Sequence, residues 1–207
     1  GSVLSGAPLT ANGATFNSSV SSNSSLTIDN SEVVGTTSSA NNFSATNTVF
    51  GNNVTSGGAL TITNAEISGN LQAANAMNLI EVNVSGTTTS TNGLINISGG
   101  GYSGLVRSNC CKVTIESAAV IRAGVTAGNN GIEISDSTVE GDLTAANNPI
   151  VLTNVAMNAG NISAGQNNVT ITGGVINANI PNAHRIFVYD GAQINGDLKA
   201  RYEVRLN

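Results

Sequence analysis

Residues 134–145 read ISDSTVEGDLTA, and the pattern in this stretch decides the fold prediction. Ile132 and Ile134 alternate with a polar residue, a polar turn follows, and every second residue from Val139 to Ala145 is apolar or small. Such alternation places the apolar side chains on one face of a β-strand. The stretch therefore predicts short strands that are joined by a turn and buried on one side.

The same pattern recurs along the chain at steps of 17 to 19 residues. The first inward residue of each repeat, here called the anchor, is apolar in all eleven repeats: Leu9, Leu26, Phe43, Leu60, Met77, Ile95, Val113, Ile132, Ile150, Val169 and Ile186. A second inward position follows at Phe16, Val33, Phe50, Ile67, Val84, Tyr102, Val120, Val139, Met157 and Ile176, with Ile194 one step late. Repeats of this length with three short strands are typical of a solenoid whose rungs pair along its axis.

The sequence thus predicts an all-β, single-stranded, right-handed parallel β-helix of about eleven rungs, with almost no helix. A left-handed hexapeptide solenoid needs an aliphatic residue every six positions, but Glu140 and Ala146 follow Ile134 at that spacing. The calcium-binding nonapeptide roll needs Gly-Gly-x-Gly-x-Asp runs, which the sequence lacks. Parallel crossover connections are overwhelmingly right-handed, which fixes the predicted hand.

Two rungs are one residue longer than their neighbours, and we expect the extra residue to bulge outward. In the first rung this makes Val120, Ala123, Val125 and Ala127 inward and turns Arg122 to solvent. In the second rung the inward residues are Met157, Gly160, Ile162 and Ala164. In most rungs a small residue such as Gly69 or Gly141 follows the second inward position, where we expect it to let the chain bend across a narrow core.

Each rung ends in an asparagine-rich corner, as at Asn41-Asn42, Asn75 and Asn129-Asn130. Asparagine tolerates the left-handed backbone of tight turns. We expect these corners to pass side-chain amide hydrogen bonds from rung to rung.

Charged residues make up only 9% of the chain and the net charge is -5. The few Lys and Arg residues form no run, so the basic patch that nucleic-acid binding requires is missing. No apolar segment is long enough to span a bilayer. A surface of uncharged Asn, Ser and Thr favours an exported bacterial protein, located outside the cell or on its surface rather than in the cytoplasm.

The even repeat predicts one β-helix domain over residues 9–207, preceded by a frayed lead-in over residues 1–8. The opening Gly1-Ser2 is typical of residues left by cloning. Four of the seven basic residues, Arg185, Lys199, Arg201 and Arg205, lie from position 185 onward. We expect this charged segment to cap the C-terminal end of the core, and the uncharged N-terminal end to be covered by a neighbouring domain or to self-associate.

Cys110 and Cys111 are the only cysteines and straddle a rung boundary. Adjacent cysteines form a strained eight-membered disulfide ring, remain thiols or bridge to another chain. Without other soft ligands nearby in sequence they do not predict a zinc site.

The remaining chemically active residues do not form a recognisable catalytic motif, and we expect no enzymatic activity, cofactor or metal. His184 lies beside Arg185 at a rung corner and is expected at the surface. The nearest groups of acidic residues are Asp29 with Glu32, and Glu133 with Asp136, Glu140 and Asp142. Either solvated charge or attraction of a cation fits the second group. Thr36-Thr37 and Thr87-Thr88-Thr89 suggest an ice-binding threonine array, but matching positions such as Leu105-Val106 interrupt it.

The segments ISGNLQA (67–73), VEGDLTA (139–145) and INGDLKA (194–200) resemble the rung motif of bactofilins, which are bacterial polymer-forming proteins. The resemblance implies a right-handed β-helix and assembly into filaments. The Asn/Ser/Thr-rich coat and the charged last rung depart from the bactofilin pattern. From the residues themselves we expect a structural or adhesive module of an exported protein, which meets a carbohydrate or other cell-surface ligand. A bactofilin-like filament subunit is the alternative, and a polysaccharide-binding or polysaccharide-degrading β-helix is the third.

Overall fold

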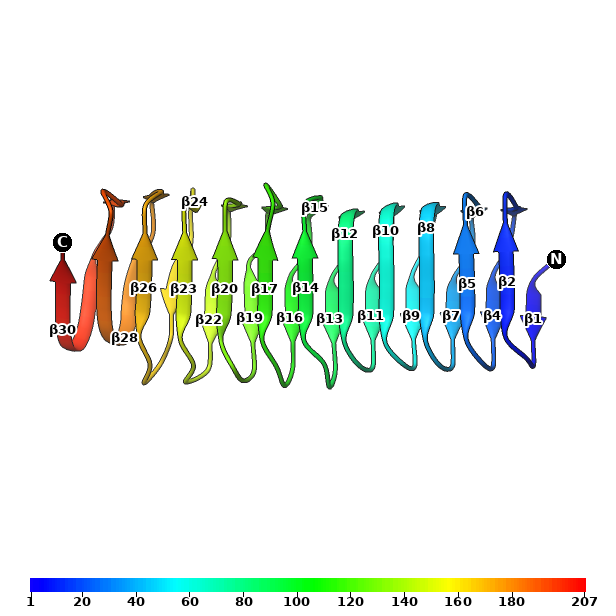
Figure 1. Cartoon of the computed structure of the whole chain (residues 1–207), viewed down its shortest axis with the longest axis horizontal. Helices are drawn as coiled ribbons and strands as arrows, with labels where there is room; N and C mark the ends of the chain where they lie inside the picture. The colour runs from blue at the N-terminus through cyan, green and yellow to red at the C-terminus, as the bar shows by residue number, and fades with distance from the viewer.

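The computed structural model describes residues 1–207 and contains 30 β-strands and no helix. Figure 1 shows a straight rod whose two termini lie at opposite ends. The strands nearer the viewer run upward while the chain passes from right to left, so the coil is right-handed. Strands of successive rungs pair in parallel, and the rungs number about eleven. The predicted fold is therefore confirmed.

Each rung contributes one strand, or one part of a longer strand, to each of three faces, which we call the front, side and back faces. The front face, nearest the viewer in Figure 1, begins at each anchor. It comprises β2 (Leu9–Asn12), β5 (Leu26–Asp29), the first halves of β8 (Phe43–Phe50), β10 (Leu60–Ile67) and β12 (Met77–Val84), then β14 (Ile95–Ser98), β17 (Val113–Glu116), β20 (Ile132–Ser135), β23 (Ile150–Thr153), β26 (Val169–Thr172), and the last parts of β28 (Asn179–Tyr189) and β30 (Leu198–Leu206).

The side face consists of short strands. It comprises β3 (Thr15–Phe16), β6 (Glu32–Val33), the second halves of β8, β10 and β12, then β15 (Gly101–Tyr102), β18 (Val120–Ile121), β21 (Thr138–Val139), β24 (Ala156–Met157), β27 (Val175–Ile176) and β29 (Gln193–Ile194).

The back face closes the rung. It comprises β1 (Val3–Ser5), β4 (Val20–Ser22), β7 (Thr37–Ser39), β9 (Val54–Ser56), β11 (Leu71–Ala73), β13 (Thr88–Ser90), β16 (Val106–Ser108), β19 (Val125–Ala127), β22 (Leu143–Ala145), β25 (Asn161–Ser163) and the first parts of β28 and β30. Strand β1 pairs with β4, so the solenoid begins within the expected lead-in and that expectation is wrong.

The core consists of inward side chains stacked along the axis. All eleven anchors occupy equivalent positions from rung to rung, as Leu60 pairs with Phe43 on one side and Met77 on the other. The core cluster contains 47 buried residues. Phe43 and Phe50 fill one rung together, with their ring centroids 5.8 Å apart in an edge-to-face arrangement. The core is thus a slender aliphatic column with few aromatic rings.

The longer rungs confirm one bulge and correct the other. Ile162 and Ala164 are buried after Met157, as predicted. In the first rung, however, Tyr102 pairs with Ile121 rather than with Val120, and Ala123 is exposed. The extra residue lies earlier, where Ser117 and Ala118 both adopt positive φ, so it shifts the inward position by one residue.

The small residues after the second inward position have a different role from the one expected. A Cβ atom on Gly69 would lie 2.5 Å from the backbone nitrogen of Asn53 in the preceding rung. On Gly141 it would lie 2.5 Å from the backbone carbonyl carbon of Ala123. These glycines permit close stacking along the axis, rather than a bend across the core.

Both ends of the rod leave apolar side chains exposed. Leu4 is 73% exposed at one end, and Val204 and Leu206 are 42% and 66% exposed at the other. Arg205 and Glu203 alternate with these two residues along β30. The basic and acidic side chains therefore flank the C-terminal end, and the expected closure of the core by a charged cap is not seen.

Candidate functional site

The front face is a regular surface, formed by one strand segment from each rung. Its outward positions are the residues one and three places after each anchor, because the anchor and the next residue but one point inward. The first column is Thr10, Thr27, Ser44, Thr61, Asn78, Asn96, Thr114, Glu133, Val151, Thr170 and Phe187. The second column is Asn12, Asp29, Thr46, Thr63, Ile80, Ser98, Glu116, Ser135, Thr153, Thr172 and Tyr189.

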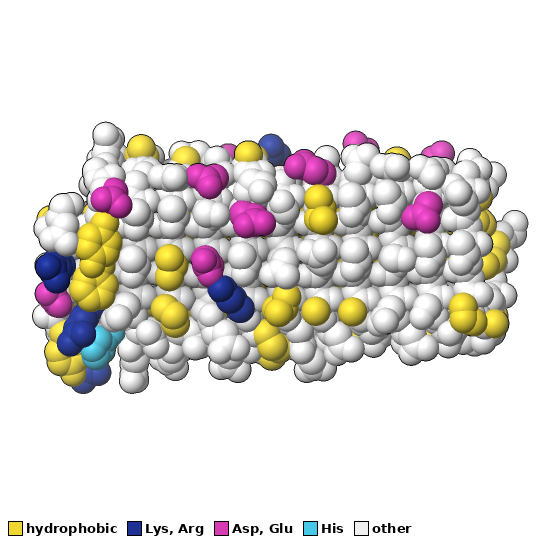
Figure 2. Space-filling view, viewed as in Figure 1, with side chains coloured by type: hydrophobic (Ala, Val, Ile, Leu, Met, Phe, Trp, Pro, Cys, Tyr) yellow, Lys and Arg dark blue, Asp and Glu magenta, His cyan; other side chains and the backbone are white.

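Most of these side chains are uncharged hydroxyls and amides. Figure 2 shows this face as mostly uncharged, with scattered acidic and basic side chains along the rod and a cluster of them at the C-terminal end. Two neighbours in the first column, Thr27 and Ser44, are hydrogen-bonded along the axis, with Thr27 Oγ1 3.1 Å from Ser44 Oγ. The array repeats about every 4.8 Å along the axis and about every 6.6 Å along each strand. It is thus a flat grid of hydrogen-bonding groups on a fixed backbone.

An aromatic pair lies at the C-terminal end of the same grid. The rings of Phe187 and Tyr189 are 6.3 Å apart between centroids and nearly parallel, at 8°. Both side chains are half-buried. Phe187 follows Thr170 in the first column, and Tyr189 follows Thr172 in the second. Figure 2 shows apolar surface on the front of the rod near its C-terminal end. This end of the grid therefore offers apolar surface beside hydroxyl groups.

His184 belongs to the last full rung and is half-buried. Its ring lies 4.4 Å from the ring of Tyr202, and the guanidinium carbon of Arg201 lies 5.5 Å from the centroid of Tyr202. Arg185 forms a 3.9 Å ion pair with Glu203. No serine or cysteine is hydrogen-bonded to His184, so the residue takes part in an aromatic and charged cluster rather than a nucleophilic pair.

The acidic group that includes Glu133 is dispersed around its rung. Glu133 pairs with Lys112, whereas Asp136 accepts a hydrogen bond from Asn154 Nδ2 at 3.2 Å. Asp142 accepts from the backbone nitrogen of Asn161 at 2.8 Å. No three His, Cys, Asp or Glu side chains are placed to hold one metal ion. The carboxylates of Glu133, Asp136 and Asp142 therefore make contacts between rungs.

The threonines singled out in the sequence do not form an outward array. Thr37 and Thr88 point inward, and they are buried between aliphatic residues of adjacent rungs. Their hydroxyl oxygens have no hydrogen-bond partner, and neither has the hydroxyl of Tyr102. The hydroxyl grid lies instead on the front face, where threonines alternate with inward residues.

The asparagine ladder also lies at a different corner from the one expected. At the corner between the front and side faces, Asn30 Nδ2 donates to Asn12 Oδ1, Asn47 to Asn30 and Asn64 to Asn47, at 3.0, 3.1 and 2.7 Å. Asn30, Asn47 and Asn64 have φ near 50°. At the back-to-front corner, asparagine side chains bond to backbone instead, as Asn42 Oδ1 does with the nitrogen of Ala59 at 3.0 Å. In the sequence, the position of the ladder is indicated by an Asn, Asp or Gly residue four places after most anchors.

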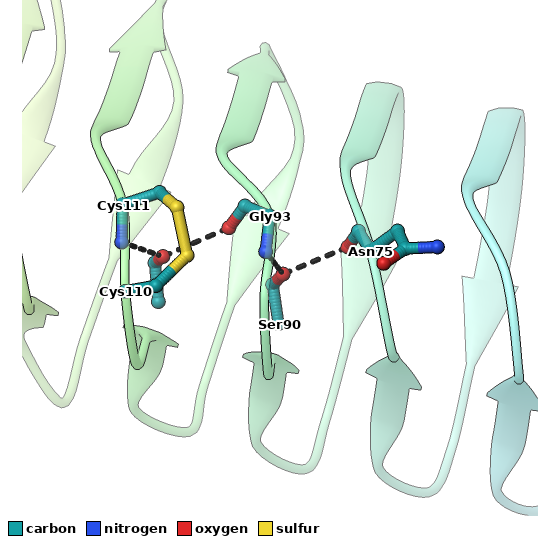
Figure 3. Close-up of a disulfide and its surroundings, with 6 residues drawn as sticks. Asn75, Ser90, Gly93, Cys110 and Cys111 are labelled. Atoms are coloured by element: carbon teal, nitrogen blue, oxygen red, sulfur yellow. Dashed lines mark hydrogen bonds between the residues drawn. A yellow bond between two sulfur atoms is a disulfide. The ribbon is translucent and has the colours of Figure 1, made fainter.

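Cys110 and Cys111 are joined to each other by a disulfide at the back-to-front corner. Figure 3 shows this corner beside the equivalent corner of the preceding rung. Ser108 Oγ accepts from the nitrogen of Cys111 and donates to the carbonyl of Gly93, both at 2.9 Å. Both cysteines are half-buried.

No protein-family model, curated protein or solved structure matches this chain. The structure also has no helix of the length and apolarity needed to span a membrane.

Proposed function

We propose that the chain is a non-enzymatic structural or adhesive module of an exported bacterial protein, which binds extended hydroxylated polymers of a cell surface through its front face. The observation that carries this proposal is the pair of outward columns, in which uncharged hydroxyls and amides fill most positions from β2 to β26. The exceptions are Asp29, Ile80, Glu116, Glu133 and Val151. A polymer with hydroxyl groups at regular intervals can exchange hydrogen bonds with many members of such a grid at once.

Rigidity supports adhesion. Each front strand from β5 to β26 is paired with the rung before and the rung after it, and the anchors from Leu26 onward are buried. A preorganised surface loses little conformational freedom when a ligand binds, so weak contacts sum more effectively. The low charge density makes such contacts hydrogen-bonded rather than ionic.

Carbohydrate is the polymer class that this surface fits best. Sugar rings present apolar C–H faces together with hydroxyl edges, and the front face presents the Phe187–Tyr189 pair together with its hydroxyl columns. Tyrosine combines an apolar ring with a polar hydroxyl and is common at binding surfaces for that reason. A disulfide in the chain supports export, because disulfides persist in oxidising compartments.

Co-sedimentation with insoluble polysaccharides tests the proposal. The purified chain is mixed with microcrystalline cellulose, chitin or peptidoglycan, and the bound fraction is measured. The double variant Thr61→Lys, Thr63→Lys places two long charged side chains on the front face, and Phe187→Ala removes the aromatic pair. We expect each to reduce binding at least fivefold.

The matched control carries the same charges on the back face. Thr55 and Gln72 are exposed outward residues of β9 and β11, so the double variant Thr55→Lys, Gln72→Lys should bind like the parent. Equal losses in both double variants, or no binding by the parent to any of the polymers, would contradict the proposal.

A bactofilin-like filament subunit is the second candidate, favoured by the exposed apolar side chains at both ends of the rod. Leu4 and Leu206 are each more than half exposed. Sedimentation velocity at rising concentration separates the candidates. The adhesive module should stay at one or two chains, whereas open-ended growth would favour the filament.

A further inference from the structure

We propose that the Cys110–Cys111 disulfide is a thiol-exchange site, which an external dithiol opens while the solenoid stays folded. The two thiols so formed act together as a site for one thiophilic group. The inference is independent of the front face, because the pair lies at the back-to-front corner.

The disulfide contributes little to holding the chain together. It links residues one position apart, with Cα atoms 3.7 Å apart, and therefore closes no loop of the unfolded chain. In the chain-entropy account, stabilisation by a disulfide grows with the length of the loop that it closes. A staple for the fold would join residues of different rungs.

The corner is held by hydrogen bonds that do not involve the sulfur atoms. Ser108 Oγ bridges the nitrogen of Cys111 and the carbonyl of Gly93 at 2.9 Å each. In addition, the nitrogen of Asn109 donates to the carbonyl of Ser90 at 3.0 Å, and that of Gly128 to the carbonyl of Ser108 at 2.9 Å. The backbone of this corner is thus tied to the rungs on both sides.

The preceding rung shows that this arrangement forms without cysteines. Ser90 Oγ accepts from the nitrogen of Gly93 at 3.0 Å and donates to the carbonyl of Asn75 at 2.8 Å, as Figure 3 shows. Asn92 and Gly93 occupy the places of Cys110 and Cys111, so this corner has no disulfide. The same hydrogen-bonded corner should therefore survive when the disulfide is opened.

A reagent can reach the sulfur atoms. Both cysteines are half-buried rather than buried, and Cys111 lines an open groove of about 430 Å³. Leu94, which is 41% exposed, and Lys112 line the same groove.

The exchange balances as a two-electron reduction. A thiolate of the dithiol attacks one cysteine sulfur, the Cys110–Cys111 bond breaks, and the other cysteine leaves as a thiolate that takes a proton from water. The second thiol of the reagent then displaces the first cysteine and closes a cyclic disulfide. The protein gains two electrons and two protons, which the dithiol supplies on oxidation.

Reduction under native conditions tests the first half of the proposal. The folded protein is treated with dithiothreitol and then with iodoacetamide, without denaturant, and the adducts are located by mass spectrometry. We expect both cysteines to be alkylated. The melting temperature of the reduced protein should lie within about 2 °C of the oxidised one, since roughly 1 kcal/mol corresponds to 2–4 °C at this chain length.

Phenylarsine oxide tests whether the two thiols act together. Its arsenic forms two As–S bonds with a dithiol and releases its oxygen as water. We expect one arsenical per reduced chain, retained against excess monothiol, and none on the oxidised chain. Cys110→Ser should lose this retention, and the oxidised parent remains the control if that variant folds poorly.

Two outcomes would overturn the first half of the proposal. One is alkylation of the cysteines only after a denaturant is added, which would make the disulfide inaccessible. The other is a fall of more than about 10 °C in melting temperature on reduction, which would make it a structural staple. If the reduced chain does not retain the arsenical, the two thiols do not act together as one site, and the second half of the proposal is wrong.

Discussion

Leu143 shows how strictly a single inward position is constrained. It is buried with no exposed surface and is stacked between Val125 and Ile162 of the neighbouring rungs. Leu143→Asp places a charge in a dry aliphatic column, so we expect a loss of several kcal/mol in the free energy of unfolding. Glu140→Lys, at an exposed position three residues earlier, should be nearly silent. Urea denaturation of both variants measures the difference, and a free energy of unfolding of Leu143→Asp within about 0.5 kcal/mol of the parent would contradict the assigned register.

Thr88 is an inward position where the native residue is not the most stabilising one. Its hydroxyl is buried without a partner between Leu71 and Val106. Valine has nearly the same shape and no polar group, so we expect Thr88→Val to raise the free energy of unfolding by about 1 kcal/mol. Thr89→Val, at the adjacent outward position, is the control and should have little effect. A loss of stability in Thr88→Val would indicate a hydrogen-bond partner for the hydroxyl.

Tyr102 gives the protein a specific sensitivity to alkaline pH. Burial, and secondarily the negative charge of Glu81, raise the pKa of its hydroxyl far above the usual value. Above about pH 10 the unfolded chain loses this proton while the native chain keeps it, so stability falls as pH rises. Below that pH both states are protonated and the effect vanishes.

Tyr102→Phe removes the titrating group, so its stability should fall less between pH 9 and pH 11 than that of the parent. The difference should approach about 1.4 kcal/mol at pH 11. Urea midpoints at the two pH values measure it. The same loss in both proteins would show that Tyr102 ionises in the native state.

At the scale of elements, the corner between the front and side faces combines a left-handed backbone with an amide ladder. Asn47 has φ 49° and bonds to both Asn30 and Asn64. Asn47→Ala loses both bonds and retains the backbone strain, so we expect a loss of about 1–2 kcal/mol. Asn47→Gly relieves the strain and should cost less. Chemical denaturation of the two variants separates the contributions, and equal losses would mean that φ has no influence here.

The elements themselves were largely predictable, because burial in a narrow core imposes a period that the sequence must keep. All eleven anchors lie at equivalent positions, and most second inward residues were also assigned correctly. The prediction of Val120 as an inward residue was wrong. An extra residue between two inward positions gives the same sequence pattern wherever it bulges, so the pattern does not place the bulge at Ser117 and Ala118. The prediction also failed for the glycines, whose constraint comes from the backbone of another rung.

The candidate site was less predictable than the fold. Adjacent threonines were considered for an outward array, yet in a strand adjacent residues point to opposite sides, so Thr37 and Thr88 were buried. The front-face columns appear only once the anchors are aligned and the positions one and three places later are compared. Hydrophobic periodicity determines which residues point outward, but it carries no signal for what those residues bind.

At the scale of the whole molecule, the proposed polymer binding requires that the grid keep its spacing over many rungs. Each rung contacts only its neighbours along the axis, so small departures in twist or spacing would accumulate along the rod. The uninterrupted pairing from β2 to β26 argues for a rigid, continuous face. A ligand that spans several rungs would sense this regularity more than the identity of any single side chain.

The most direct measurement of that claim is a distance between two spin labels in the first front-face column. Cysteine variants at Thr27 and Thr170, in a Cys110→Ser, Cys111→Ser background, place labels eight rungs apart. Double electron–electron resonance should give one narrow distribution centred near 38 Å, from eight steps of about 4.8 Å. A broad distribution, or a centre shorter by several rung spacings, would contradict a rigid parallel solenoid with this register.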